Sequence, residues 1–354
     1  MLQLKDINHV VYQHPDLAEI ERFLVDFGMV VAHRTESRLY FRGAGTVPYI
    51  YVAERAERPA LGAIAFALES AEDLARAAGL PGASQIEPLE GPGGGMRVAL
   101  TDPGGRRIEL VHGIAPVERL ELRAALTVNT CDAKPRRGHL QRPPKGPAQI
   151  LRLGHAALGV SDLKSSIDWY TGTLGLLPSD FIVRGEPEER VACFMRLNRG
   201  SDWTDHHTIA VFTAPKDHVH HVSFEVQDLD AQQLGHRWLG AQGWKSFWGI
   251  GRHVLGSQIF DYWVDPSGNI IEHFTDSDLL TADVAPGYTE GSDESLYVWG
   301  PEMNVPRFLS GALDAQQVFR RSQFKGNRAR DVPGSFGAVC GAAPSLGWDE
   351  AQTR

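Results

Sequence analysis

The sequence predicts an α+β fold made of two tandem domains, each built from paired units in which a strand and a helix are followed by further strands. Three observations predict this fold. The chain has 354 residues, which is more than a single domain usually holds. Two long blocks of the chain resemble each other from their first strand to their last. Both blocks also close on the same kind of tight turn between two apolar strands.

The opening of each block predicts a strand, a helix and a turn. Residues 7–12 and 153–160 suit strands, and residues 16–28 and 162–175 carry apolar side chains at helical spacing. Each helical segment starts with an Asp, which can accept hydrogen bonds from the first backbone N–H groups, and each ends with a Gly. The same order in both blocks indicates two copies of one unit.

A second half-unit is visible inside each block. Residues 63–68 predict a strand before a helix over 71–78, and residues 221–226 predict a strand before a helix over 228–239. Each domain therefore holds two such units, and the chain holds four.

Each block closes on a turn that places a carboxylate in an apolar strand. The turns are residues 102–105 and 265–268, where Pro presets φ and Gly accepts a positive φ. A Glu follows the Asp of each turn at the same spacing, Glu109 in the first block and Glu272 in the second. Glu272 shares a strand face with apolar residues, and a buried carboxylate needs a cation or a proton.

These blocks set the expected domain boundaries. We expect an N-terminal metal-free domain over 1–126, a C-terminal metal-binding domain over 150–276 and an extension over 277–354. Residues 127–149 are rich in Pro, Gly and basic side chains, which is typical of a linker. The last part of the extension, residues 318–354, has the composition of a loosely ordered tail.

Composition excludes several classes of function. The net charge of −9, with 35 Lys and Arg residues, argues against a nucleic-acid partner. No apolar run is long enough to span a bilayer, and residues 1–6 lack the pattern of a signal peptide, so we expect a cytoplasmic protein. Three scattered cysteines, Cys131, Cys193 and Cys340, indicate neither a disulfide framework nor a thiolate metal site.

A candidate metal site emerges from three strands of the second block. His155 and His221 hold the same place in their strands, and Glu272 adds a carboxylate from a third. Two imidazoles and one carboxylate form a facial triad that suits non-haem Fe(II) and O2 chemistry, although zinc also accepts these ligands. The first block keeps His9 and Glu109 but has Ala63 at the position of His221, which predicts a structural twin without a metal.

Further polar and aromatic residues surround this candidate site in the sequence. His253 and Tyr262 precede Glu272, and a pair of histidines, His206 and His207, precedes another strand. Neighbouring strand residues face opposite ways, so only one histidine of the pair is expected to face inward. Four aromatic residues can form either an apolar wall for a substrate or ordinary core packing: Trp244, Phe247, Trp248 and Phe260.

The end of the second block resembles a known signature. The residues are Gly251-Arg252-His253, Tyr262-Trp263-Val264-Asp265-Pro266-Ser267-Gly268 and Glu272. They resemble the signature of the type I extradiol dioxygenases of the vicinal oxygen chelate superfamily, which cleave the rings of catechols and dihydroxybiphenyls. The resemblance covers roughly residues 5–276, with one departure at Asp261, where the family usually has an aliphatic residue. It implies two tandem vicinal-oxygen-chelate domains, each with paired βαβββ modules forming an open barrel-like sheet.

The resemblance also implies a site and a reaction. His155, His221 and Glu272 match the iron ligands, while His206, His253 and Tyr262 match acid/base and hydrogen-bonding residues, with His206 preferred to His207. The implied cofactor is Fe(II), although Mn(II) stays open, and the implied partners are a substituted catechol and O2. The implied reaction opens the ring with both oxygen atoms incorporated, and the family is usually homo-oligomeric. His218, His220, His236 and His273 match no role.

Two other functions fit the same fold. A glyoxalase-type isomerase or thiol transferase using Zn, Ni or Mn explains the three ligands but not His206, His253 and Tyr262 together. A small-molecule binding protein of the bleomycin-sequestering kind predicts an aromatic cleft without a complete triad, whereas this triad is complete. The sequence therefore favours the dioxygenase.

Overall fold

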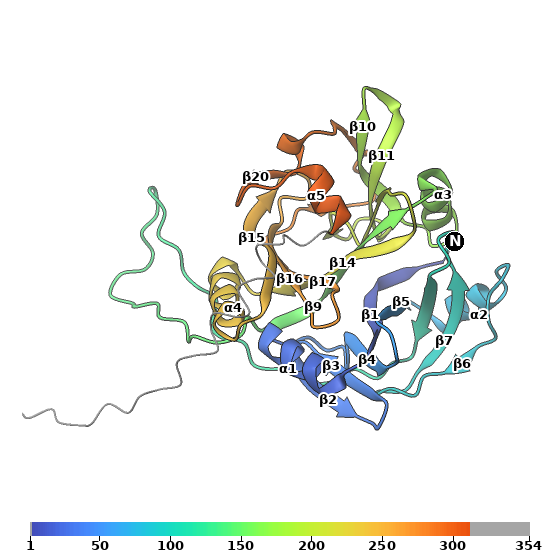
Figure 1. Cartoon of the computed structure of the whole chain (residues 1–354), viewed down its shortest axis with the longest axis horizontal. Helices are drawn as coiled ribbons and strands as arrows, with labels where there is room; N and C mark the ends of the chain where they lie inside the picture. Colours follow the sequence, from blue (N-terminus) through green and yellow to red (C-terminus); the bar gives the residue numbers. More distant parts are fainter. Residues whose placement is uncertain (1, 312–354) are drawn as a thin grey trace, which may run out of the picture. The chain divides into compact units, whose positions relative to one another are not determined.

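The computed structural model describes residues 2–311, and these residues build two large sheets (Figure 1). Residues 312–354, which include Cys340 and the expected loose tail, lie outside the described residues. The first half of the chain forms an eight-stranded sheet, and the second half with part of the extension forms a ten-stranded sheet. A short two-stranded ladder pairs β12 (Thr204–Asp205) with β18 (Leu279–Leu280).

The elements alternate as the repeat predicts. The first half contains β1 (Leu4–His14), α1 (Leu17–Phe27), β2 (Val30–Arg34), β3 (Arg38–Arg42), β4 (Tyr51–Arg55), β5 (Ala60–Leu68), α2 (Ala71–Ala78), β6 (Glu87–Pro88), β7 (Met96–Thr101) and β8 (Arg107–His112). The second half contains β9 (Ile150–Val160), α3 (Leu163–Gly172), β10 (Leu177–Arg184), β11 (Glu186–Arg196), β12 (Thr204–Asp205), β13 (Ile209–Thr213), β14 (His218–Val226), α4 (Leu229–Ala241), β15 (Lys245–His253), β16 (Ile259–Val264) and β17 (Ile270–Thr275). The extension adds β18 (Leu279–Leu280), β19 (Gly287–Glu290), the 3₁₀ helix η1 (Asp293–Ser295), β20 (Tyr297–Trp299) and α5 (Val305–Ser310).

Helix starts follow the predicted capping. The Asp16 side chain accepts hydrogen bonds from the first turn of α1, and Gly28 ends that helix with φ 109°. Asp162 caps α3 in the same way, but α3 already ends at Gly172. Gly175, with φ 76°, turns the chain three residues later than the helix end. The predicted helices are confirmed, although α3 ends earlier than predicted and α4, which ends at Ala241, later.

Strand order and register confirm that the two sheets are copies of one plan. The first sheet has the order β2-β3-β4-β1-β5-β8-β7-β6, and the second contains the matching order β10-β11-β13-β9-β14-β17-β16-β15. His9 lies opposite Ala65, which lies beside Glu109, just as His155 lies opposite Ser223, which lies beside Glu272. The predicted α+β fold with paired βαβββ modules is thus confirmed.

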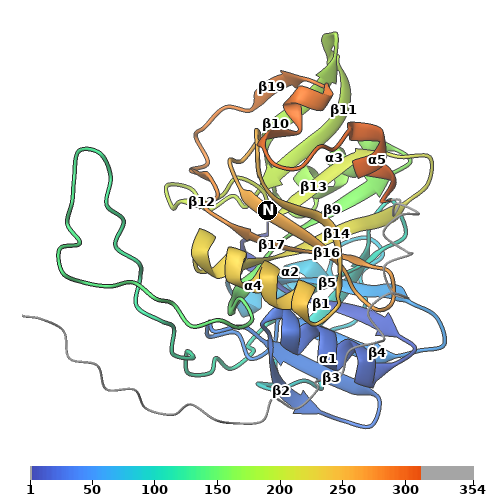
Figure 2. The same cartoon turned by 60° about the vertical axis from the view of Figure 1, so that its left-hand side comes forward.

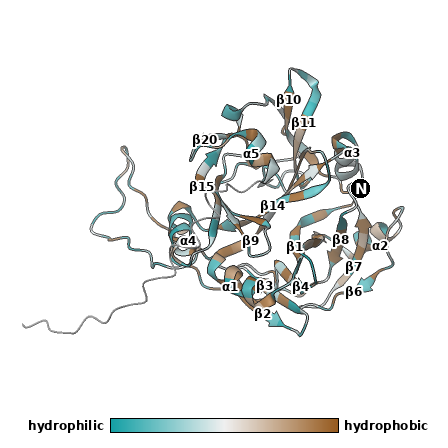
Figure 3. Ribbon diagram, viewed as in Figure 1, coloured by the Kyte–Doolittle hydropathy of each residue, from teal (hydrophilic) through white to brown (hydrophobic). Residues whose placement is uncertain are grey.

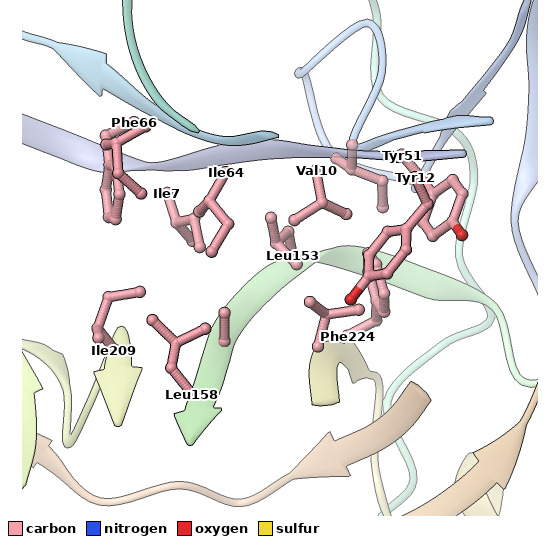
Figure 4. Close-up of a cluster of buried hydrophobic side chains, with 14 of the residues drawn as sticks. Ile7, Val10, Tyr12, Tyr51, Ile64, Phe66, Leu153, Leu158, Ile209 and Phe224 are labelled. Atoms are coloured by element: carbon pink, nitrogen blue, oxygen red, sulfur yellow. The ribbon is translucent and has the colours of Figure 1, made fainter. Parts of the chain in front are cut away.

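A hydrophobic core runs through both halves. Figure 4 shows Ile7, Val10 and Ile64 of the first sheet facing Leu153 and Leu158 of the second, and all of them are buried. Hydrophobic residues recur along the strands of both sheets (Figure 3), as burial of these faces requires. Burial of this apolar surface holds the halves together. One core is shared by both halves, so it does not mark a boundary between two domains. The expected domain boundary at residues 127–149 stays a prediction.

Each half also inserts its closing turn into the other half. Arg106, at the end of the first turn, donates hydrogen bonds to the backbone carbonyls of Gly159 and His218 in the second half. In return, Ser267 of the second turn forms a 2.7 Å hydrogen bond with Nδ1 of His14 in the first half. Each half therefore holds the closing turn of the other, and these two contacts fix the position of one sheet relative to the other.

The extension completes the second sheet at both of its edges. β19 pairs with β10 at one edge, and β20 pairs with β15 at the other. Only residues 291–296 separate these two strands, so the edges must approach each other and the sheet must curl into an open barrel. α4 lies on the outer side of this sheet, against β15, β16 and β17, and contacts α1 (Figure 2).

Within residues 2–311 the helices are too short or too polar to cross a bilayer.

Candidate active site

Three adjacent strands bring the predicted triad together. His155 lies on β9, His221 on β14 and Glu272 on β17, and these strands are neighbours in the sheet. Nε2 of His155 lies 3.1 Å from Oε2 of Glu272, and Nε2 of His221 lies 3.4 Å from both of these atoms. Atoms bound at about 2.1 Å and at right angles around one metal ion lie about 3 Å apart. The three side chains therefore have the spacing of ligands on one face of a metal ion.

Burial leaves the Glu272 carboxylate in need of a positively charged partner. Glu272 is fully buried, and neither of its carboxylate oxygens accepts a hydrogen bond of acceptable geometry from residues 2–311. Burial acts to raise the pKa of Glu272, but the adjacent imidazole of His155 outweighs it and holds that pKa below its usual range. A buried, ionised carboxylate beside two ring nitrogens fits a divalent metal ion.

Hydrogen bonds around His221 fix which of its nitrogens faces the triad. Nδ1 of His221 lies 2.7 Å from Nδ1 of His220, and Nε2 of His220 lies 2.6 Å from the carbonyl oxygen of Phe308. Burial lowers the pKa of His221 well below its usual value and lowers that of His220 to about 4. Both imidazoles are neutral at pH 7, so His221 needs to lose no proton before it binds a metal.

His253 and Tyr262 lie beside the triad as predicted. Tyr262 is directly opposite Glu272 across β16 and β17. Its hydroxyl lies 2.8 Å from Nε2 of His253, whose Nδ1 lies 2.8 Å from the carbonyl oxygen of Leu296. Burial and then the charge of Glu272 raise the pKa of Tyr262 well above its usual value, and burial lowers the pKa of His253. The phenol is therefore protonated, and its proton points to a neutral histidine.

The structure places His207, and not the preferred His206, against the triad. The ring of His207 lies 4.2 Å from that of His155, centroid to centroid, and is tilted against it. His206 lies behind His207: its Nδ1 is 3.1 Å from Nδ1 of His207, and its Nε2 is 2.6 Å from the carboxylate of Asp180. Burial and then the neighbouring histidines hold the pKa of His207 well below its usual value. His207 is the residue of the pair that faces the triad.

Comparisons with known proteins identify the family. Residues 152–273, which include all three triad residues, match the Glyoxalase/Bleomycin resistance protein/Dioxygenase superfamily. Metapyrocatechase 2 of Cupriavidus necator is 30% identical over 308 residues, which is 86% of this chain and 90% of that protein. The chain belongs to the type I extradiol dioxygenases. It is therefore an enzyme of catechol ring cleavage.

Solved structures show that this dioxygenase shares its fold with enzymes of two activities. Homoprotocatechuate 2,3-dioxygenase of Brevibacterium fuscum, in complex with 3,4-dihydroxyphenylacetate, has a TM-score of 0.72 and 21% identity over 87% of this chain and 92% of that one. The Mn(II)-bound glyoxalase of Novosphingobium aromaticivorans also has a TM-score of 0.72 and 21% identity, over 87% and 94%. At this identity the likeness shows the fold alone.

An aromatic cluster covers the dioxygenase site on the side of Tyr262. The cluster consists of Phe247, Trp248, Phe260, Tyr262, Val264, Ile270, Met303 and Phe308. Three of the four aromatic residues suggested by the sequence thus lie next to the site. Trp244 does not: it packs edge-on against Phe23 and donates a hydrogen bond to Asp26 of the first half. Phe308, which comes from the extension, was not suggested by any repeat.

A cavity of about 760 Å³ adjoins this aromatic cluster. It is lined by Val254, Tyr297, Val298, Met303, Asn304 and Arg307, together with the carboxylates of Asp293, Glu294 and Glu302. Tyr297 of the cavity wall pairs with His253 across β20 and β15, while His253, Tyr262 and the triad residues are not part of the lining. Acidic residues outnumber basic ones along its wall.

The twin position in the first half holds guanidinium groups. Oε1 of Glu109 lies 3.1 Å from Arg97 and 2.8 Å from Arg107, so this buried carboxylate has two cationic partners within the protein. Ala63 occupies the place of His221, as the strand register shows. The charge that Glu272 requires from outside is thus supplied to Glu109 by arginine side chains.

Asp261, the departure from the family signature, lies on the opposite side of β16 from the site. Its carboxylate is 2.9 Å from Nδ1 of His236 on α4 and accepts a 2.7 Å hydrogen bond from the indole of Trp263. Similarly, His273 points away from Glu272 and hydrogen-bonds to the carbonyl oxygen of Phe27. These residues join the sheet to the helices that cover it and take no part in the site.

Proposed function

We propose that this extradiol dioxygenase uses Fe(II) to cleave a substituted catechol next to its two hydroxyl groups, with both atoms of O2 entering the product. The triad of His155, His221 and Glu272 supports the proposal, because a facial set leaves adjacent positions open for two reactants. When bound, Fe(II) supplies a centre at which a catechol and O2 are held and activated together. The metapyrocatechase relative favours this reaction over a glyoxalase-type one.

Tyr262 and His253 form a path for the first proton that the catechol loses. Because the hydroxyl of Tyr262 donates to His253, its oxygen is free to accept a hydrogen bond from a substrate hydroxyl. As the substrate proton moves to Tyr262, the phenolic proton moves to Nε2 of His253. The resulting imidazolium keeps its Nδ1–H on the carbonyl oxygen of Leu296, which stabilises the positive charge.

His207 is assigned the second acid/base role in place of His206. Asp180 accepts a hydrogen bond from Nε2 of His206, whose Nδ1 then accepts from Nδ1 of His207. These bonds leave the lone pair of His207 on Nε2, which can take the second substrate proton. His207 can return that proton to oxygen as the O–O bond breaks. His206 and Asp180 orient the ring that does this.

The surroundings favour an uncharged substituent on the catechol. Phe247, Trp248 and Phe260 give an apolar surface beside Tyr262. Asp293, Glu294 and Glu302 line the adjoining cavity and repel an added carboxylate. We therefore propose an alkyl- or aryl-substituted catechol as the substrate, in contrast to the anionic ligand in the Brevibacterium structure.

The proposal is tested by loading the purified protein with Fe(II) without oxygen and then measuring oxygen uptake with a panel of catechols. We expect one O2 consumed per catechol, a yellow ring-opened product and incorporation of both atoms from ¹⁸O2. We also expect alkyl catechols to have a kcat/KM more than tenfold above that of 3,4-dihydroxyphenylacetate. Stoichiometric iron without oxygen uptake across the panel would contradict the proposal, and Mn(II) loading tests the choice of metal.

The ligand assignment has a matched control within the chain. Glu272→Gln keeps the side-chain volume but removes the charge, and we expect metal content to fall from about one ion per chain to below a tenth while the circular dichroism spectrum is unchanged. Glu109→Gln, at the twin position, should keep its metal. Loss of metal in the Glu109 variant alone would place the ion in the first half.

A further inference from the structure

His220 links the candidate metal ligand His221 to the last described helix. Its Nδ1 lies 2.7 Å from Nδ1 of His221, and its Nε2 lies 2.6 Å from the carbonyl oxygen of Phe308 on α5. The His220 side chain is buried, and its ring lies 4.6 Å from the Phe308 ring, centroid to centroid. Residues 88 positions apart in the chain therefore meet at one imidazole.

The direction of both hydrogen bonds follows from the carbonyl group. A carbonyl oxygen can only accept, so Nε2 of His220 carries the proton. A neutral His220 then has its lone pair on Nδ1 and accepts the Nδ1–H of His221. The lone pair of His221 is left on Nε2, which is the atom that faces His155 and Glu272. The chain of bonds thus selects the tautomer of His221 that can bind a metal.

His155 has no comparable support. Its Nδ1 is buried and has no hydrogen-bond partner among residues 2–311. Of the two candidate imidazole ligands, His221 is thus the one whose ring nitrogen is assigned by a described side chain. Partners of this kind strengthen metal binding because they fix the orientation and raise the basicity of the ligand.

α5 is held at both ends, which makes the Phe308 carbonyl a defined acceptor. At its start, the N–H of Val305 donates to the side chain of Asp293 in η1. At its end, the Phe308 ring packs against Trp248 and Tyr262, with centroid distances of 5.3 and 5.5 Å. The Phe308 carbonyl accepts one hydrogen bond from the N–H of Gly311, which ends the helix, and its second lone pair is available to His220.

We propose that His220 is a positioning residue of the metal centre: held by the Phe308 carbonyl, it fixes His221 in its metal-binding tautomer, so that metal affinity depends on the docking of α5. This inference rests on the proposed function only in taking the triad as the metal site. It makes the extension part of the centre, although no residue of the extension up to residue 311 is among the candidate ligands. Any movement of α5 away from β14 weakens the hold on His221.

Two substitutions of His220 separate its two hydrogen bonds. His220→Asn places an amide oxygen near the position of Nδ1, where it accepts from His221 but does not reach Phe308. His220→Phe keeps an aromatic ring of similar size and removes both bonds. His218→Asn, two residues earlier on β14, is the control, because His218 bonds to the backbone of Lys216 and not to the triad.

The first readout is equilibrium binding of Zn(II) or Mn(II), measured by competition with a chelating dye. We expect His220→Phe to raise the Kd by about 10- to 100-fold, while His220→Asn and His218→Asn stay within about threefold of the wild type. A wild-type Kd for the folded His220→Phe protein overturns the proposal. Circular dichroism reports whether each variant folds.

The second readout needs no variant at all. In the metal-free wild-type protein with ¹⁵N-labelled histidine, we expect nuclear magnetic resonance to show His221 protonated on Nδ1 and His220 protonated on Nε2. A proton on Nε2 of His221 in that form overturns the proposal even where the variants fail to fold.

The dependence on α5 is tested by a double-mutant cycle. Phe308→Ala removes the ring that anchors the end of α5, and we expect it to raise the metal Kd severalfold. In the His220→Asn background it should have no further effect, since Asn no longer reaches the carbonyl. Equal effects in both backgrounds would remove α5 from the mechanism. Because these readouts are metal binding and tautomer state, they stand or fall separately from oxygen uptake with catechols.

Discussion

Two pairs of adjacent histidines are arranged alike in this dioxygenase. In each pair one ring faces the candidate metal site, His207 beside the triad and His221 as part of it, and the other ring lies behind and bonds to its Nδ1. The Nδ1–Nδ1 distances are 3.1 Å for His206 and His207 and 2.7 Å for His220 and His221. The rear histidine is in turn fixed by Asp180 in one pair and by the Phe308 carbonyl in the other. At the scale of single residues, the hydrogen bonds of each pair determine which ring nitrogen of the inward histidine carries the proton.

Removing the Tyr262 hydroxyl should slow turnover without loss of metal. Tyr262→Phe interrupts the proton path to His253 but leaves the triad intact. We expect kcat to fall by roughly 10²-fold, in the usual range for a lost acid/base group, with metal content unchanged. Steady-state oxygen uptake and metal analysis of the same preparation measure both quantities. Unaltered kinetics would remove Tyr262 from proton transfer.

The two members of the first histidine pair should differ in their effect on turnover. His207→Phe removes the ring that faces the triad, and we expect kcat/KM to fall by roughly 10²-fold. His206→Asn removes only the link to Asp180, so the loss should be about tenfold or less. Oxygen-uptake kinetics of both variants decide the order. A larger loss in the His206 variant would restore the original assignment.

The sequence identified the triad but not the inward histidine, and the reason is local. His155, His221 and Glu272 lie within strands whose register repeats that of the first half, so their alignment could be read from the repeat. His206 and His207 lie between β12 and β13 in irregular chain, where side chains need not alternate. The signal that was missed is that His207, like His221, directly follows another histidine, and each of these two pairs is joined by a hydrogen bond.

At the scale of elements, the inserted turn of the first half should be a major source of stability. The Arg106 side chain is 7% exposed and binds Asp102 and two carbonyls of the second half. Arg106→Ala leaves these groups buried without their partner, and we expect a loss of about 3 kcal/mol in the free energy of unfolding. Urea denaturation measures it, with Arg34→Ala, which removes an exposed ion pair, as the control expected to change the free energy of unfolding much less. Equal losses would show that the turn contributes nothing special.

Regular elements were predictable where they belong to the repeat, and not beyond it. The paired strands and the Asp-capped helices follow from periodicity and capping, because both signals are local. β19, β20 and α5 carry no repeat and no strong pattern. They are short, at four, three and six residues, and their conformation depends on pairing with distant strand edges. Local sequence does not contain that information.

At the scale of the whole molecule, the buried histidines should make the metal-free protein sensitive to acid. Burial lowers the pKa of four of them from 6.5 to about 4: His9, His14, His220 and His273. Between these values the unfolded chain binds protons that the folded chain does not, so stability falls as the pH drops from about 6.5 to 4. Burial raises the pKa of Asp6 and Asp265 to about 6, which acts in the opposite direction but involves fewer groups.

Urea midpoints of the metal-free protein, measured between pH 7.5 and 4.5 in the presence of a chelator, test this expectation. The midpoint should fall steadily below pH 6.5. A midpoint that rises on acidification would mean that the aspartates dominate.

Two expectations for the whole molecule stay predictions. The expected homo-oligomer is tested by measuring the molecular mass of the full chain in solution by analytical ultracentrifugation. The expected cytoplasmic location is measured by fractionation of cells that express the protein at natural levels.

The segment from β19 to β20 limits how far the two edges of the second sheet can separate. Each strand is hydrogen-bonded to a different edge of the sheet, and the six residues 291–296 join them. The two edges can move apart only if the backbone hydrogen bonds of β19 or of β20 break. The circumference of the open barrel is therefore restrained. Cleavage by a protease at Gly291 should release this restraint, while Asp293, which binds the start of α5, and Leu296, which binds His253, stay on the β20 side of the cut.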